Sequence, residues 1–90
     1  MAAWRVLFAA EATRDFSRLD RVVRIQVFER IQWLAENFDR TAPVPLHDDL
    51  RGFFKLRAGD WRVAYTFESA ERIIRIREIK HRSKAYKKRK

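Results

Sequence analysis

The sequence predicts an α+β domain built from an N-terminal strand, two helices and three further strands. Two observations predict this class: apolar residues recur at helical spacing between residues 12 and 38, and they alternate with polar residues after residue 52. The chain has 90 residues, which is enough for one hydrophobic core. No linker or repeat divides it, so we expect a single domain over residues 1–90.

The N-terminal half is predicted to hold one strand and a helical hairpin. Residues 4–8, WRVLF, are aromatic and β-branched, which is typical of a strand. Ala12, Phe16 and Leu19 follow at spacings of four and three and predict a short amphipathic helix. Asp20 is placed to cap a second, longer helix. The apolar stripe of that helix comprises Val23, Val27, Phe28, Ile31, Leu34, Ala35 and Phe38.

The C-terminal half is predicted to be three antiparallel strands. Residues 39–49 contain two prolines and predict a loop. The strands are residues 52–57, 60–68 and 72–80, with turns centred on Ala58-Gly59 and Ser69-Ala70. With residues 4–8 they form a mainly antiparallel four-stranded sheet, and the helical hairpin packs on one face of it. The last residues, SKAYKKRK, are expected to be a short helix or a cationic tail.

The predicted turns fix which side chains share a face of the sheet. Phe54, Val63 and Ile76 form one cross-strand row toward the helices, and Leu56 and Trp61 lie on the same face. The opposite face receives a row of cations, Lys55, Arg62 and Arg77, with Phe53, Ala64 and Arg75 beside it. Like charges directly opposite one another destabilise a sheet, so the row serves a purpose other than folding.

We interpret the cationic row as a phosphate-binding surface, since arginine offers a planar fork that fits a phosphate. The second hairpin should return residues 79–82 to the level of Asp60 and Arg62, which brings His81 and Arg82 to the end of the row. Tyr86 follows Arg82 by four residues, on the same side if the tail is helical. The alternatives are a solvated face whose cations pair with Asp60, Glu68 and Glu78, and an ordinary exposed histidine.

Charge and composition narrow the class of partner. The net charge is +9, and residues 51–90 hold 14 lysines and arginines against 4 acidic residues, whereas residues 1–50 hold 7 against 8. One cationic half favours nucleic acid or an acidic protein as partner. The two distant histidines predict no metal site, and the absence of cysteine fits a cytoplasmic location. No stretch of roughly 20 apolar residues, the length of a membrane span, is present.

The segment LRGFFKLRAGDWRVAYTF, followed by IREIKHRSKAY, resembles the RelE/ParE superfamily of toxins from bacterial type II toxin–antitoxin modules. The resemblance covers essentially the whole chain, in element order and in length. It implies a small α+β fold, a cognate antitoxin and, in the RelE branch, cofactor-free cleavage of mRNA in the ribosomal A site. The alternative is the ParE branch, which poisons DNA gyrase and is not a nuclease. A non-catalytic RNA- or protein-binding module of the same fold is a further alternative.

The resemblance also implies roles for particular residues. Catalytic or RNA-binding positions of the family match Lys55, Arg57, Arg62, Arg82 and Tyr86, and the lysine and the tyrosine favour the RelE branch. His81 matches members with a histidine just before the arginine. The sequence departs from some members at Phe53, where they carry a second lysine, and here Phe53 is available to stack on a base.

Metal-free cleavage of RNA uses the 2′-hydroxyl as the nucleophile, so the protein must stabilise charge on the phosphoryl oxygens. On this hypothesis Arg62 and Arg82 bind the scissile phosphate, and Lys55 either favours ionisation of the 2′-hydroxyl or accepts its proton. His81 protonates the leaving 5′-oxygen, because a histidine pKa near 6.5 suits a general acid. The remaining expected RNA contacts are Phe53 and Tyr86 to bases, Arg57 and Arg77 to phosphates, and Lys84, Lys87 and Lys88 to ribosomal RNA.

Overall fold

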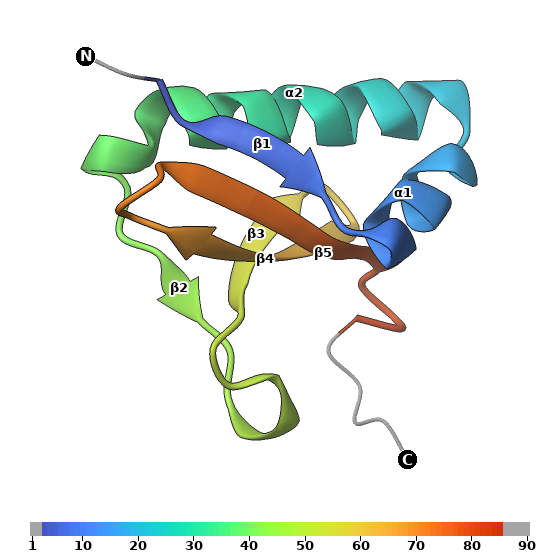
Figure 1. Cartoon of the computed structure of the whole chain (residues 1–90). Helices are drawn as coiled ribbons and strands as arrows, with labels where there is room; N and C mark the ends of the chain where they lie inside the picture. The colour runs from blue at the N-terminus through green and yellow to red at the C-terminus, as the bar shows by residue number, and fades with distance from the viewer. Residues whose placement is uncertain (1–2, 86–90) are drawn as a thin grey trace.

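The computed structural model describes residues 3–85 and shows two helices on one face of a five-stranded sheet (Figure 1). The strand order is β1-β5-β4-β3-β2; β1 runs parallel to β5 and the other pairs are antiparallel. The elements are β1 (Arg5–Phe8), α1 (Ala10–Ser17), α2 (Arg21–Asn37), η1 (Phe38–Arg40), β2 (Val44–Pro45), η2 (Asp48–Leu50), β3 (Phe54–Ala58), β4 (Trp61–Glu68) and β5 (Ile73–His81).

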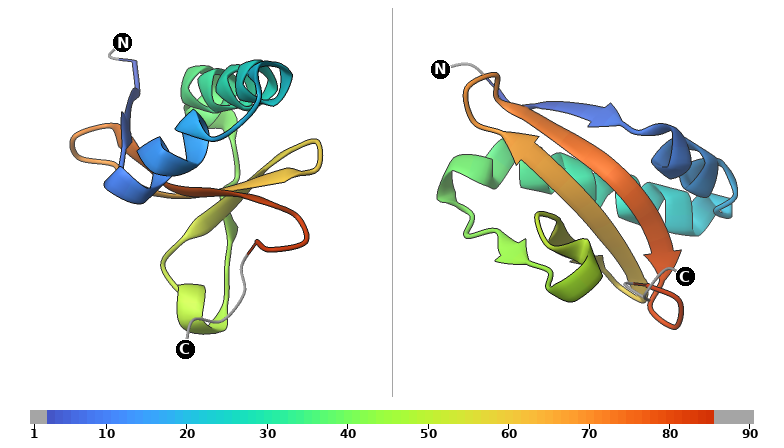
Figure 2. Two further views of the ribbon diagram at one scale, coloured as in Figure 1. Left: turned by 90° about the vertical axis from the view of Figure 1, so that its right-hand side faces the viewer. Right: turned by 60° about the horizontal axis from the view of Figure 1, so that its bottom comes forward.

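The predicted α+β class is confirmed, but the sheet has five strands and not the four that we expected. The additional strand, β2, lies in the segment that we predicted to be a loop, and it pairs with Phe54 and Lys55. Its two residues include Pro45, and a proline is accommodated at the edge of a sheet because the outer N–H is not needed there. Figure 2 shows the loop that follows β2, which includes η2, lying on the side of the sheet away from α2.

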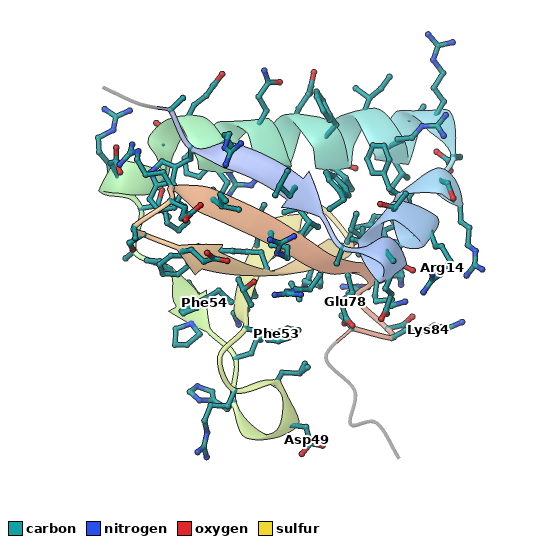
Figure 3. The ribbon with its side chains drawn as sticks, viewed as in Figure 1. Arg14, Asp49, Phe53, Phe54, Glu78 and Lys84 are labelled. Atoms are coloured by element: carbon teal, nitrogen blue, oxygen red, sulfur yellow. The ribbon has the colours of Figure 1, made fainter. Side chains whose placement is uncertain are left out.

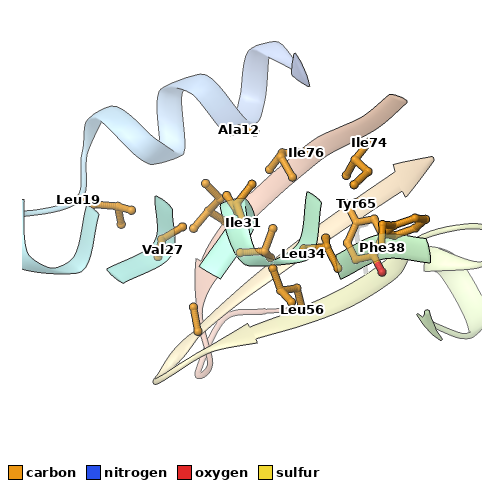
Figure 4. Packing of buried hydrophobic residues seen from close by; sticks show 13 residues of the cluster. Ala12, Leu19, Val27, Ile31, Leu34, Phe38, Leu56, Tyr65, Ile74 and Ile76 are labelled. Atoms are coloured by element: carbon orange, nitrogen blue, oxygen red, sulfur yellow. The ribbon is translucent and has the colours of Figure 1, made fainter. Parts of the chain in front are cut away.

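Helix α2 begins where the sequence predicts, because the Asp20 carboxylate accepts a hydrogen bond from the N–H of Val23 at 3.0 Å. Val27, Ile31 and Leu34 are buried against the sheet (Figure 4). The expected burial of Phe28 is wrong: its side chain is 52% exposed. Successive residues are turned by about 100° around a helix, so Phe28 lies beside the buried stripe and outside the contact with the sheet.

The core lies between α2 and the inward side chains of the three central strands. Leu56, Val63 and Tyr65 contribute from β3 and β4, and Ile76 and Ile79 contribute from β5. One end of this core is an aromatic cluster whose members are Trp4, Phe38, Phe54, Tyr65 and Phe67. Tyr65 is 1% exposed and is therefore a packing residue, and its burial raises its pKa to about 12.

The turn between β3 and β4 comprises Gly59 and Asp60, so the predicted centre at Ala58-Gly59 is wrong by one residue. Gly59 takes φ +61°, a left-handed conformation that favours glycine. A Cβ at this position would also lie 2.5 Å from Nε2 of Gln26. Ala58 therefore ends β3 as a buried residue, and the faces of β3 and β4 stay as predicted.

The hairpin between β4 and β5 differs more from the prediction. Its turn spans residues 69–72, and a β-bulge interrupts the ladder: Tyr65 pairs with Ile76 and Ala64 with Glu78, so Arg77 is unpaired. The predicted row of Lys55, Arg62 and Arg77 is therefore wrong. The row in the structure is Arg57, Arg62 and Lys80. The predicted return of residues 79–82 is confirmed, since the N–H of Arg82 donates to the carbonyl of Asp60 at 2.8 Å.

Candidate nucleic-acid interface

Arg57 and Arg62 lie directly opposite each other on the face of the sheet away from α2, which we call the open face. Arg62 Nη1 donates to the carbonyl oxygen of Gly59 at 2.8 Å and to that of Trp61 at 3.1 Å. Arg57 Nε approaches the same Gly59 oxygen at 3.4 Å. The turn thus offers one carbonyl dipole to two guanidinium groups, which offsets their repulsion and holds two cations side by side.

Lys55 belongs to the same group of cations, because it lies two residues before Arg57 on an exposed part of β3. Lys55, Arg57 and Arg62 line a hollow of about 410 Å³ at the β3 edge of the sheet, where Trp33 and Leu34 of α2 also contribute to the lining. Arg30 of α2 also lines it, with Nε donating to the carbonyl of Arg57 at 2.9 Å and its guanidinium lying 4.3 Å from the centre of the Trp33 ring. The hollow is therefore a cationic groove with an aromatic border.

Lys80, the third residue of the row, is held away from this groove by two carboxylates of α1. Its Nζ lies 2.9 Å from Oδ1 of Asp15 and 3.2 Å from Oε2 of Glu11. Burial alone would lower the pKa of Lys80, but its hydrogen bonds to Asp15 and Glu11 outweigh burial and raise the pKa. Lys80 stays charged and is neutralised locally.

Asp15 is a structural residue that the sequence analysis missed. It is 7% exposed, and its Oδ2 accepts a hydrogen bond from the N–H of Ile79 at 2.9 Å. Strand β1 pairs with β5 only as far as Ile76, so Asp15 supplies an acceptor that no strand offers at Ile79. The available signal was its position among Ala12 and Leu19 on the inner side of the first helix, where a carboxylate requires a partner.

His81 and Arg82 end β5 at the level of the β3–β4 turn. His81 pairs with Trp61, and their rings pack edge to face with the ring centres 5.4 Å apart. Ser83 approaches His81 Nδ1 with its Oγ at 3.0 Å and its N–H at 3.3 Å; the N–H bond favours the tautomer that carries its proton on Nε2. Arg82 Nε lies 3.9 Å from the carboxylate of Asp60, and the Arg82 side chain is 64% exposed.

The structure thus brings Lys55, Arg57 and Arg62 together and places Arg82 nearby, at the other side of the turn. It places His81 in a different hollow, which Lys80 and Lys84 also line. The expected site residues Tyr86, Lys87 and Lys88 lie outside the described residues.

Phe53 and Arg77 lie together on the open face, apart from the groove. Arg77 Nε donates to Oγ1 of Thr66 at 3.0 Å, and the Arg77 guanidinium lies 6.0 Å from the centre of the Phe53 ring. The neighbouring Glu78 is only 5% exposed. Figure 3 shows Phe53 and Glu78 on the side of the sheet away from α2.

Two further properties concern metals and membranes. Within residues 3–85, no three His, Asp or Glu side chains converge as a metal site would require. Over the same residues, neither helix combines the length and the apolar character needed to cross a bilayer.

Comparison with known proteins identifies the family. Residues 6–86 match the model of the ParE toxin of the type II toxin–antitoxin system parDE. The chain is 30% identical over 84 residues to Toxin RelE of Mycobacterium tuberculosis, covering 93% of this chain and 87% of that protein. The chain therefore belongs to the RelE/ParE family of toxins of type II toxin–antitoxin systems.

Solved structures share the fold. The toxin–antitoxin complex RelBE2 of M. tuberculosis superimposes with a TM-score of 0.77 at 26% identity, over 89% of this chain and 99% of that one. The archaeal RelE–RelB complex of Pyrococcus horikoshii superimposes with a TM-score of 0.70 at 22% identity, over 93% of this chain and 100% of that one. The predicted resemblance is thereby confirmed at the level of family and fold.

Proposed function

We propose that this toxin is a ribosome-dependent endoribonuclease that cleaves mRNA without a metal ion, through attack by the RNA 2′-hydroxyl. The observation that carries the proposal is the pairing of two guanidinium groups, Arg57 and Arg62, on the carbonyl of Gly59 beside Lys55. Preorganised cations of this kind stabilise the charge that develops on phosphoryl oxygens in the transition state. The similarity to Toxin RelE supports the same assignment.

The residues take distinct roles in this proposal. Arg62, with Arg82, binds the scissile phosphate, Arg57 binds a flanking phosphate, and Lys55 favours ionisation of the 2′-hydroxyl. His81, as an imidazolium, gives its Nε2 proton to the leaving 5′-oxygen; in this form Nδ1–H donates to Ser83 Oγ, which lies 3.0 Å away. Tyr86 stacks on a base, and the lysines of the C-terminal segment, Lys84, Lys87 and Lys88, bind ribosomal RNA, whose phosphates favour basic segments.

A cognate antitoxin is the second partner in the proposal, because two structural relatives are complexes of a toxin with its antitoxin. Its toxin-binding segment is expected to be acidic and to cover the cationic groove, since closely held cations favour a neutralising partner. The affinity of the complex should then fall as the salt concentration rises. An affinity that does not change with salt would contradict a charge-based contact.

A second candidate function is inhibition of DNA gyrase. It is favoured by one observation: the family model that matches residues 6–86 describes ParE toxins of parDE systems. A gyrase inhibitor of this family needs no proton donor and no phosphate site for cleavage, so the two candidates differ in what Arg62 and His81 do.

The decisive experiment is primer extension on a translated mRNA after brief induction of the toxin, paired with a gyrase supercoiling assay on the purified protein. We expect cuts within translated codons for the wild type and for Arg5→Ala, an exposed arginine of β1 outside the site, and none for Arg62→Ala. Intact mRNA together with inhibited gyrase would establish the second candidate. Intact mRNA with active gyrase would leave a non-catalytic binding module.

A further inference from the structure

The end of β3 lies at an edge of the sheet, and within residues 3–85 no strand lies beyond it. Strand β2 begins at Val44, opposite Lys55, so no residue of β2 pairs with Arg57. Pairs in an antiparallel ladder alternate between hydrogen-bonded and non-hydrogen-bonded. Ala58 and Trp61 close the two-residue turn as a hydrogen-bonded pair, so the carbonyl of Arg57 points away from β4. A carbonyl at such an edge requires a donor from outside the sheet.

Arg30 of α2 supplies this donor. Its Nε lies 2.9 Å from the carbonyl oxygen of Arg57, and the carbon of its guanidinium lies 4.3 Å from the centre of the Trp33 ring. The oxygen accepts from one edge of the guanidinium, and the ring attracts one of its faces, so the two contacts restrain the same group. Arg30 therefore fixes the backbone of Arg57 as a neighbouring strand would.

The same stretch of backbone orients the two guanidinium groups of the cationic groove. Arg57 Nε and Arg62 Nη1 both approach the carbonyl oxygen of Gly59, at 3.4 and 2.8 Å. Helix α2 also meets the turn directly, because a Cβ at Gly59 would lie 2.5 Å from Nε2 of Gln26. If the end of β3 moved away from α2, the carbonyl that holds both arginines would move with it.

The geometry of Arg30 suits positioning better than the binding of a phosphate. A guanidinium binds a phosphate best through two parallel N–H groups. The edge of the Arg30 guanidinium that contains Nε already donates to Arg57, and Trp33 lies against one of its faces. The groove also has three other cations, Lys55, Arg57 and Arg62.

We propose that Arg30 is a positioning residue of the cationic groove. By binding the carbonyl of Arg57 and resting on Trp33, it fixes the end of β3, so that Arg57 and Arg62 meet the RNA together. The proposal rests on the proposed function only in taking RNA to be what these two arginines bind.

The first test separates the rate of cleavage from binding. Single-turnover cleavage of mRNA on programmed ribosomes by the full-length toxin gives the maximal rate and the half-saturating toxin concentration separately. Arg30→Ala should lower the maximal rate about 10- to 100-fold, the effect of a small misplacement of reacting groups, with little change in the half-saturating concentration. Arg30→Lys should also be slow, since lysine keeps the charge but has no planar group to lie on Trp33. Arg21→Ala, at an exposed arginine of the same helix, should match the wild type.

Trp33 offers a second pair of variants. Trp33→Ala should lower the rate in the same way, whereas Trp33→Phe keeps an aromatic face and should retain most of it. Because both residues act through one contact, the double variant Arg30→Ala/Trp33→Ala should be no slower than Arg30→Ala alone. Each variant is assayed below its melting temperature, where a purely structural role of Arg30 would leave the rate unchanged.

The second test needs no nuclease activity. Amide hydrogen exchange of the free toxin at Ala58 and Trp61 should accelerate about 2- to 10-fold in Arg30→Ala, the effect of one lost hydrogen bond, and should not change in Arg21→Ala. The affinity for a non-cleavable 2′-O-methyl RNA oligonucleotide, measured by fluorescence anisotropy, should fall with salt as steeply in Arg30→Ala as in the wild type.

Three results would overturn the proposal. They are a wild-type rate for Arg30→Lys, unchanged amide exchange in Arg30→Ala, and a salt slope that is shallower by about 0.7 in Arg30→Ala, which would make Arg30 a phosphate ligand. Faster exchange in a toxin that cuts no translated mRNA would overturn the proposed function and support the positioning contact. Cleavage of mRNA together with unchanged exchange would do the reverse.

Discussion

The two hairpins of the sheet organise their polar residues in different ways. The β3–β4 hairpin is regular: its two-residue turn keeps strict alternation, and its outward-facing arginines, Arg57 and Arg62, converge on one carbonyl. The β4–β5 hairpin carries a four-residue turn and a bulge, and two neighbouring polar residues, Arg77 and Glu78, line a pocket of the open face. A regular ladder gathers like charges across strands, whereas a bulge places unlike charges side by side along one strand.

Deleting single residues of β5 tests this difference and should give the largest effect. Removal of Arg77 leaves Ile76, Glu78 and Ile79 in strict alternation, so the deleted chain should fold. Removal of Arg75 instead reverses the faces of Ile73 and Ile74 relative to Ile76, and should abolish cooperative thermal unfolding. Circular dichroism of both deletions decides the point, and two equally unfolded proteins would contradict the bulge as the origin of the exposed pair.

The regular hairpin was largely predictable from the sequence, because alternation alone assigns Leu56 and Val63 to the core and Arg57 and Arg62 to the other face. The turn was displaced by one residue, since the sequence does not show that Gln26 approaches Gly59 closely. The displacement moves every pairing by two positions, an even number, so the faces were still right.

The bulged hairpin was not predicted, although a signal was present. Ile76 and Ile79 enclose two polar residues, which breaks the period of two that a regular strand requires. Strand β2 could not be predicted, and neither could the partner of Asp15, the N–H of Ile79, although the position of Asp15 in its helix indicated that it needs one. Both are contacts between elements that are distant in the sequence, and a local sequence pattern does not show such contacts. The family resemblance supplied candidate site residues that the strand pattern alone does not single out, Arg57 among them.

The next largest effect is expected where the two hairpins meet, at His81. If His81 is the general acid, His81→Gln should lower single-turnover cleavage by roughly 10²–10⁴-fold with little loss of ribosome binding. Tyr86→Phe should retain most activity, while Tyr86→Ala loses roughly 1–3 kcal/mol of base stacking. A nearly silent His81→Gln with a severe Tyr86→Phe would assign the proton to the tyrosine hydroxyl.

On the regular hairpin, Arg62→Ala should reduce cleavage by about 10²–10³-fold, the usual loss for one charge-stabilising donor. Its far-ultraviolet circular dichroism should match the wild type, because Arg62 faces away from the core. The contrasting variant is the adjacent Val63→Asp, which places a charge at a position that is 0% exposed and should prevent folding. An unfolded Arg62→Ala protein would show that the assignment of faces is wrong.

A smaller effect is expected from Asp15 of α1, which accepts a hydrogen bond from β5 in the bulged β4–β5 hairpin. Asp15→Ala leaves the buried N–H of Ile79 without its acceptor and should lower the free energy of unfolding by about 1–3 kcal/mol. Asp15→Asn keeps an oxygen acceptor and should lose less. Urea unfolding measures both against Thr13→Ala, an exposed residue of the same helix. Equal stability of Asp15→Ala and Thr13→Ala would refute the contact.

The smallest effect concerns the turn of the bulged β4–β5 hairpin, where Arg72 forms an ion pair with Asp39. Arg72 Nη2 lies 2.8 Å from Oδ2 of Asp39, and the indole N–H of Trp4 donates to Oδ1 at 2.9 Å. The hydrogen bond from Arg72, followed by that from Trp4, lowers the pKa of Asp39 below its ordinary value of 3.8. The pair is exposed to solvent, so its contribution to stability is small and is screened by salt.

The pH dependence of Asp39→Asn follows from the sign of this shift. A carboxyl whose pKa is lowered by folding adds its full stabilisation above the pKa of the unfolded state and loses it as the pH falls through the folded pKa. The melting temperature of the wild type should therefore exceed that of Asp39→Asn at pH 6, and the two should converge below pH 3.8. Glu71→Gln, in the same turn, leaves the Arg72–Asp39 pair in place, so its melting temperature at pH 6 should stay close to that of the wild type. A difference that stays constant down to pH 2 would mean that the Arg72–Asp39 ion pair does not stabilise this turn.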